Sequence, residues 1–68
     1  MQATTTEATL TPALIVQHYQ RAYQQVHKRE AQVLHLTSEW YQVNGEMVHR
    51  LVLMREISRL RELAQAQR

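Results

Sequence analysis

Apolar residues recur in alternating steps of three and four positions along the stretch from Thr11 to Val43. This spacing is typical of a helix that buries one stripe of side chains against another helix. Arg29 is the one polar residue within the stripe. The pattern therefore predicts a long amphipathic helix over residues 12–43. Its apolar positions are Ile15, Tyr19, Ala22, Val26, Val33, Leu36, Trp40 and Val43.

The start of this helix is marked by Thr11 and Pro12. A threonine hydroxyl can accept a hydrogen bond from a free N–H of the first turn, and proline at the first helical position gives up no intrahelical bond. Residues 1–10 are small, polar and rich in threonine. They offer little apolar surface to bury, so we expect them to form a disordered tail.

Asn44 and Gly45 are expected to end the first helix, because both residues tolerate the left-handed conformation that follows a helix. A second helix is then predicted over residues 46–65, which makes residues 11–68 an all-α, two-helix antiparallel hairpin. The alternative is one long continuous helix through Gly45 in a coiled coil, at a cost of about 1 kcal/mol for the glycine. We prefer the hairpin, because Asn-Gly is a compound breaker.

The second predicted helix changes character along its length. Its far half places Leu53, Ile57, Leu60 and Ala64 on one face, whereas residues 47–54 point apolar side chains in almost every direction. A helix that is apolar all round must be covered on all sides, and one partner helix covers only one. We therefore expect a homodimer that forms a four-helix bundle. The predicted interface residues are Trp40, Met47, Val48, Leu51, Val52 and Met54.

Unequal helix lengths would leave the Pro12 end of the first helix projecting beyond its partner. The apolar side chains of that end, Leu14, Ile15, Val16 and Tyr19, would then need cover from another molecule. An exposed apolar helix end of this kind is typical of a surface that binds a helix of another protein. We therefore predict a small non-catalytic adaptor or regulator that binds another protein, of unknown identity, and also self-associates.

Composition narrows the classes of protein further. The chain has 68 residues, no cysteine and a formal charge of +2. The length allows one domain, and the missing cysteines exclude disulfides and thiolate metal sites and fit a reducing compartment, so we expect the cytoplasm. Apolar runs are too short for a membrane span. No nucleophile motif or glycine-rich phosphate loop is found, so we expect no enzyme and no cofactor.

Arginines of the second helix suggest nucleic-acid binding as the alternative function. The candidate contacts are Arg50, Arg55, Arg59 and Arg61. A nucleic-acid footprint should be a continuous basic stripe, but Glu56 and Glu62 interrupt this one and are spaced to pair with Arg59. A salt-bridged, solvated face is therefore the preferred interpretation.

Glu46 and His49 suggest a lower-ranked alternative, a metal site. A Glu-x-x-His motif on facing helices holds metal ions in some four-helix bundles, and a dimer would supply two copies. The glutamate nearest in the first helix, Glu39, points away on the helical wheel, and the four histidines have no helical pairing. Glu46 and His49 are therefore only weak candidates for metal ligands in a four-helix bundle.

Overall fold

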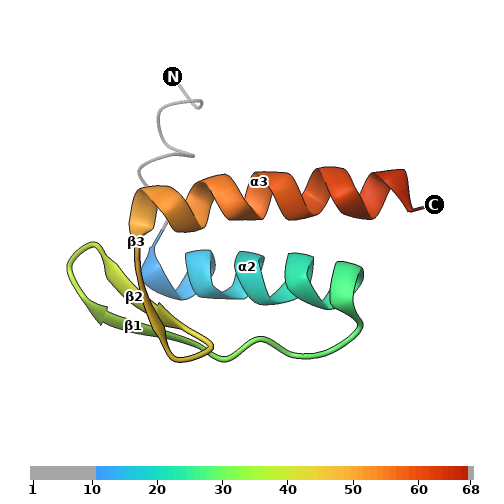
Figure 1. Cartoon of the computed structure of the whole chain (residues 1–68). Coiled ribbons are helices and arrows are strands. Elements are labelled where there is room, and N and C mark those ends of the chain that lie inside the picture. The colour runs from blue at the N-terminus through green and yellow to red at the C-terminus, as the bar shows by residue number, and fades with distance from the viewer. Residues whose placement is uncertain (1–10, 68) are drawn as a thin grey trace, which may run out of the picture.

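The computed structural model describes residues 11–67 and contains both helices and a β-sheet (Figure 1). In the described part of the chain a helix is followed by three strands and a second helix. The elements are α2 (Pro12–His27), β1 (Val33–Thr37), β2 (Trp40–Val43), β3 (Glu46–His49) and α3 (Arg50–Ala66). The fold is therefore α+β.

The three strands form one antiparallel meander in the order β1-β2-β3. Val43 pairs with Glu46, so a two-residue turn of Asn44 and Gly45 joins β2 to β3. Both turn residues have positive φ, 50° for Asn44 and 91° for Gly45. A tight hairpin turn of the type I′ class requires this conformation at both positions, and Asn-Gly is its preferred sequence.

Strands β1 and β2 are joined by Ser38 and Glu39, and Ser38 also has a positive φ of 43°. The register shifts between His35 and Thr37, which leaves Leu36 as an extra residue in a β-bulge. The pairing extends past the strand ends, because the Asn44 N–H donates to the Gln32 carbonyl at 2.7 Å and the Arg50 N–H donates to the Glu39 carbonyl at 2.7 Å. The second of these bonds fixes the first residue of α3 to the turn between β1 and β2.

Helices α2 and α3 lie side by side and run in the same direction, with the sheet beside their N-terminal halves (Figure 1). The core forms where the two helices meet the inner face of the sheet. Tyr41, on the central strand, is fully buried. The remaining buried residues are Ile15, Tyr19, Ala22, Ala31, Val33, Val43, Leu53, Ile57 and Leu60.

The all-α prediction is wrong, and with it the helical hairpin, the four-helix bundle and the continuous coiled coil. The first helix ends at His27, where Lys28 adopts a left-handed φ of 60° and its N–H donates to the Gln24 carbonyl. Residues 33–43 form strands in place of the second half of a helix. The second helix begins at Arg50 and not at residue 46, because residues 46–49 form β3.

Two local predictions are confirmed. Thr11 is the N-cap of α2, and its hydroxyl accepts a hydrogen bond from the Leu14 N–H at 3.3 Å. In α3, three residues of the predicted apolar face, Leu53, Ile57 and Leu60, are buried, and the fourth, Ala64, is half-buried. The tail predicted for residues 1–10 lies outside the described residues.

Candidate functional site

The first candidate surface is the face of the sheet turned away from the helices. Tyr41 and Val43 point to the core, so Trp40 and Gln42, which alternate with them, point outward. Cross-strand pairing places Leu34 and Met47 beside Gln42, and His49 beside Trp40. Thr37 pairs with Trp40, and Leu36, the extra residue of the bulge just before this pair, is exposed. We call these six residues the outer face: Leu34, Leu36, Trp40, Gln42, Met47 and His49.

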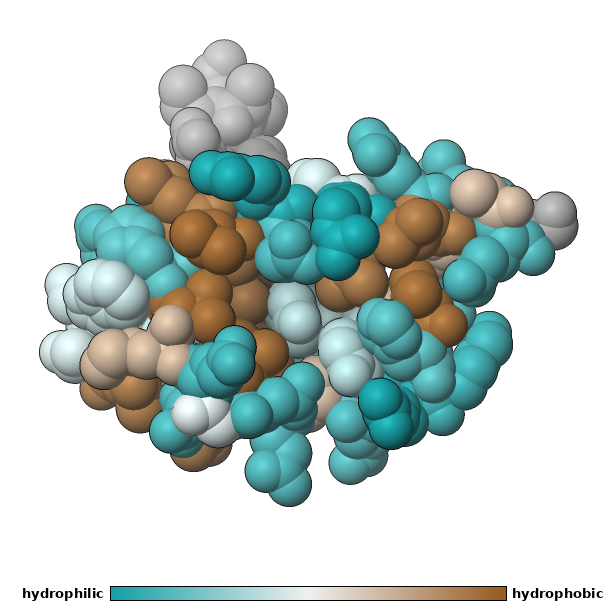
Figure 2. All heavy atoms as spheres, viewed as in Figure 1, coloured by the Kyte–Doolittle hydropathy of each residue, from teal (hydrophilic) through white to brown (hydrophobic). Residues whose placement is uncertain are grey.

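The outer face is unusually apolar for an exposed sheet surface. The exposed fraction is 59% for Leu34, 44% for Leu36, 41% for Trp40 and 65% for Met47. Its two polar residues are Gln42 and His49, and it contains no aspartate, glutamate, lysine or arginine. Figure 2 shows hydrophobic side chains gathered at the end of the molecule where the sheet and the start of α3 lie. Clustered exposure of this kind marks interaction surfaces in soluble proteins.

His49 connects the outer face to helix α3. Its Nδ1 accepts a hydrogen bond from the Leu51 N–H at 3.1 Å, which makes the side chain the N-cap of α3. Its Nε2 lies 3.0 Å from a carboxylate oxygen of Glu39. Because Nδ1 acts as an acceptor, Nε2 carries the proton, and the Nε2–H group donates a hydrogen bond to that carboxylate. The imidazole also meets the Trp40 ring edge-on at 5.0 Å, so it holds the indole in place.

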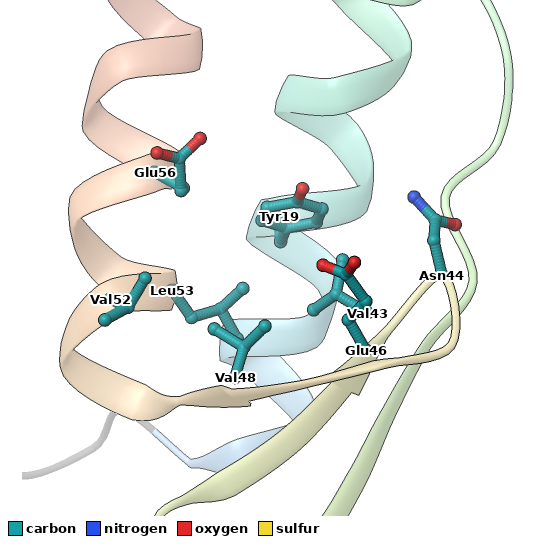
Figure 3. A pocket seen from close by; sticks show the side chains of 8 residues that line it. All are labelled: Tyr19, Val43, Asn44, Glu46, Val48, Val52, Leu53 and Glu56. Carbon is teal, nitrogen blue, oxygen red and sulfur yellow. The ribbon is translucent and has the colours of Figure 1, made fainter.

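The second candidate surface is a groove of about 480 Å³ between the two helices and the sheet (Figure 3). Helix α2 contributes one wall, helix α3 the other, and the β2–β3 hairpin closes one end. The lining residues are Tyr19, Val43, Asn44, Glu46, Val48, Val52, Leu53 and Glu56. We call this surface the hairpin groove.

The hairpin groove has an apolar floor and a polar rim. Val43 and Leu53 are buried at the floor, with Val48 half-buried beside them. Figure 3 shows the Tyr19 hydroxyl and the carboxylates of Glu46 and Glu56 around the opening. Burial raises the pKa of Tyr19, the Glu56 carboxylate and Tyr23 raise it further, and Arg59 partly offsets the rise. The hydroxyl is therefore held in its neutral form beside an acidic rim.

Within residues 11–67 no long apolar helix end projects beyond its partner, so the arrangement assumed for the predicted partner-binding site is wrong, whereas partner binding by these residues stays a prediction. Ile15 and Tyr19 are both core residues, because the sheet covers the N-terminal half of α2. Val16 is half-buried against that core, and Leu14 retains 37% exposure. The long projecting helix that this site required is absent from residues 11–67.

The residues predicted at the dimer interface are divided among three places. Trp40 and Met47 lie on the outer face, whereas Val48 points toward the core. Leu51 and Val52 are exposed in the first turn of α3, and Met54 is half-buried against the core. The interface predicted from the sequence did not include Leu34 and Leu36, which also lie on the outer face. Leu34 and Leu36 lie two residues apart with His35 between them, a period-two signal that could have indicated a strand but would have placed the leucines in the core.

The arginine side chains of α3 lie in different surroundings. Arg59 pairs with Glu56 at 3.0 Å, as the spacing predicted, and Arg61 lies 3.3 Å from His18 Nδ1 across the helix pair. Arg50 is half-buried, and Arg55 is exposed. The four side chains form no continuous basic stripe, and nucleic-acid binding stays a prediction.

Glu46 and His49 are not brought together as metal ligands. Both lie in β3, where positions three residues apart point to opposite faces of a sheet. Glu46 accordingly lines the hairpin groove, and His49 lies on the outer face against Trp40. The prediction that these two residues lie on one face of a helix, as the Glu-x-x-His motif requires, is therefore wrong. Within residues 11–67, no three histidine or acidic side chains cluster as metal ligands would.

Comparison of the chain with protein-family models, with curated proteins and with solved structures finds no match. Neither of the two described helices combines the length and the apolar character needed to cross a bilayer.

Proposed function

We propose that this chain is a non-catalytic protein-interaction module that self-associates through the outer face of its sheet and acts as a small adaptor or regulator. The observation that supports the proposal is the uncovered apolar face, with Leu34 and Met47 more than half exposed. The cytoplasm is the compartment we propose, since a chain without cysteine needs no oxidising environment.

A second copy of the chain is the occupant that best fits this surface. In a two-fold dimer the same patch meets itself, so any charge at its centre faces a like charge. The outer face carries no acidic or basic side chain other than His49, which already pairs with Glu39. Two outer faces can therefore stack as sheets do, about 10 Å apart, with the helices on the outside.

The strength of this association follows from the exposed area. Covering four partly exposed large side chains on each copy yields roughly 1 kcal/mol for each side chain. Lost translational and rotational freedom costs at least about 4 kcal/mol. The side chains covered on both copies together contribute about 8 kcal/mol, so the balance of about 4 kcal/mol corresponds to a weak, reversible dimer with a Kd of about 1 mM.

Light scattering or sedimentation of the full chain between about 10 μM and about 1 mM tests the proposal. The wild type should shift toward a dimer as its concentration rises. Leu34→Asp and Met47→Asp should remain monomeric, because each places a charge at the centre of the interface. Ser58→Glu adds the same charge on an exposed position of α3 and should dimerise like the wild type.

Circular dichroism of each variant establishes that its fold is retained. A wild-type chain that stays monomeric up to about 1 mM would overturn the proposal. So would a folded Leu34→Asp variant that dimerises as strongly as the Ser58→Glu control.

A further inference from the structure

We propose that the hairpin groove binds a basic side chain, lysine or arginine, presented by a partner polypeptide. This inference concerns a different surface from the outer face and does not depend on self-association. It rests on three features of the groove: its apolar floor, the two carboxylates of its rim and the Tyr19 hydroxyl.

The floor and the rim match the two parts of a long basic side chain. Lysine and arginine carry an apolar stem that packs on hydrophobic surface and a cationic end that stays near polar groups. Val43, Val48 and Leu53 supply the apolar contact for the stem. Glu46 and Glu56 supply negative charge at the opening for the cation. A neutral or acidic side chain would leave this charge uncompensated.

Tyr19 is an observation independent of the two carboxylates. Its side chain is 7% exposed, and its hydroxyl reaches the groove (Figure 3). Among residues 11–67, no side chain or backbone group forms a hydrogen bond with this hydroxyl. A phenol held neutral can accept a hydrogen bond from an ammonium or guanidinium group. The groove therefore offers a hydrogen-bond acceptor at the mouth of the apolar floor.

The state of the two carboxylates determines how an incoming cation is bound. Glu56 already pairs with Arg59 through two contacts, at 3.0 Å and 3.4 Å. Glu46 is exposed and forms no ion pair within the described part of the chain. Glu46 is thus the carboxylate that is free to pair with the cation of the ligand. At Glu56 that cation would have to compete with Arg59.

A partner polypeptide fits the groove better than a free small amine does. The groove is open along one side, and Val52 at its rim is 43% exposed. A free amine would leave that rim and most of its own surface in water, whereas a polypeptide segment attached to the basic side chain covers both. The added apolar contact at Val52 favours the larger ligand.

A nuclear magnetic resonance titration of the full, ¹⁵N-labelled chain tests the proposal. The probe is an acetylated and amidated pentapeptide with a central lysine between leucines. Its matched control replaces the lysine with norleucine, which keeps the stem and removes the charge. The lysine peptide should shift the amide signals of groove residues, Val48 and Val52 among them. The norleucine peptide should bind at least about twofold more weakly.

Three charge variants assign the binding to this groove. Glu46→Gln should weaken binding of the lysine peptide by about two- to fivefold, the range expected for one partly exposed ion pair. Arg59→Gln should strengthen binding, because it releases Glu56 from its internal partner. Glu62→Gln makes the same charge change on α3, outside the groove, and should bind the lysine peptide as the wild type does.

Equal affinity for the lysine and norleucine peptides would overturn the proposal. An unchanged affinity in a folded Glu46→Gln variant would also overturn it. Neither result would affect the proposal that the outer face self-associates, because light scattering tests that proposal separately.

Discussion

At the scale of single residues, Tyr41 combines complete burial with an unsatisfied hydroxyl. The residue is 0% exposed, and its hydroxyl oxygen has no hydrogen-bond partner among residues 11–67. A buried polar group without a partner carries a desolvation cost of about 1–3 kcal/mol. Tyr41 lies on the central strand, where its ring packs against His35 at 4.9 Å. The ring therefore stabilises the fold, and the hydroxyl weakens it.

Tyr41→Phe should raise the free energy of unfolding by about 1 kcal/mol, because it removes the unpaired oxygen and keeps the ring. Chemical denaturation followed by circular dichroism measures the change. Tyr23→Phe, at a half-buried position of α2, is the control and should change stability by less. A loss of stability in Tyr41→Phe would mean that the hydroxyl has a partner in solution.

The two buried tyrosines also predict the response of the fold to alkaline pH. Burial is the main cause that raises the pKa of both Tyr19 and Tyr41 above the ordinary value of 10.0. The unfolded chain therefore loses these protons at a lower pH than the folded chain does. As a result, stability is fully present below pH 10.0 and falls as the pH rises above it.

Denaturation midpoints measured from pH 8 to pH 11 at fixed temperature check this response. The wild type should lose stability above about pH 10, and Tyr19→Phe should lose less, because one of the two shifted groups is gone. Equal losses in the two proteins would contradict the assigned role of Tyr19.

At the scale of the elements, the start of α3 depends on a histidine N-cap. His49→Ala removes the acceptor for the Leu51 N–H and should lower the free energy of unfolding by about 1 kcal/mol. His49→Asn supplies an amide oxygen at the same position and should restore part of the loss. Thermal unfolding of both variants measures the difference. Equal destabilisation by alanine and asparagine would show that the cap bond contributes nothing.

The two helices could be predicted from the sequence far better than the strands. Thr11 and Pro12 mark the start of α2 by local chemistry, and Leu53, Ile57 and Leu60 keep one period throughout α3. Both features are local, so tertiary structure did not alter them. The end of α2 at His27 was missed because Lys28, without glycine's freedom, adopts the left-handed cap.

The strands were missed because short segments fit two periods at once. Val33, Leu36, Trp40 and Val43 continue the spacing of the first helix, yet Tyr41 and Val43 also alternate as a strand requires. Asn44 and Gly45 were correctly interpreted as left-handed residues, but the same conformation serves a helix end and a hairpin turn. Because β2 pairs with β3, these two residues form a hairpin turn and not a helix end.

At the scale of the whole molecule, each face of the sheet carries a different surface. The inner face completes the core and supplies the floor of the hairpin groove, while the outer face has no layer above it among residues 11–67. Trp40 and Met47 were predicted as interface residues and lie on the outer face. The groove could not be predicted, because Tyr19, Glu46 and Glu56 come from three elements that converge only in the folded chain.

Isotope-filtered nuclear Overhauser measurements detect contact between two outer faces residue by residue. One copy is labelled with ¹³C and ¹⁵N, and it is mixed with unlabelled chain at about 1 mM, a concentration that populates a weak dimer. We expect intermolecular contacts from the Trp40 indole to the methyl groups of Leu34, Leu36 or Met47. Intermolecular contacts confined to α3, or none at this concentration, would contradict the proposed contact between outer faces.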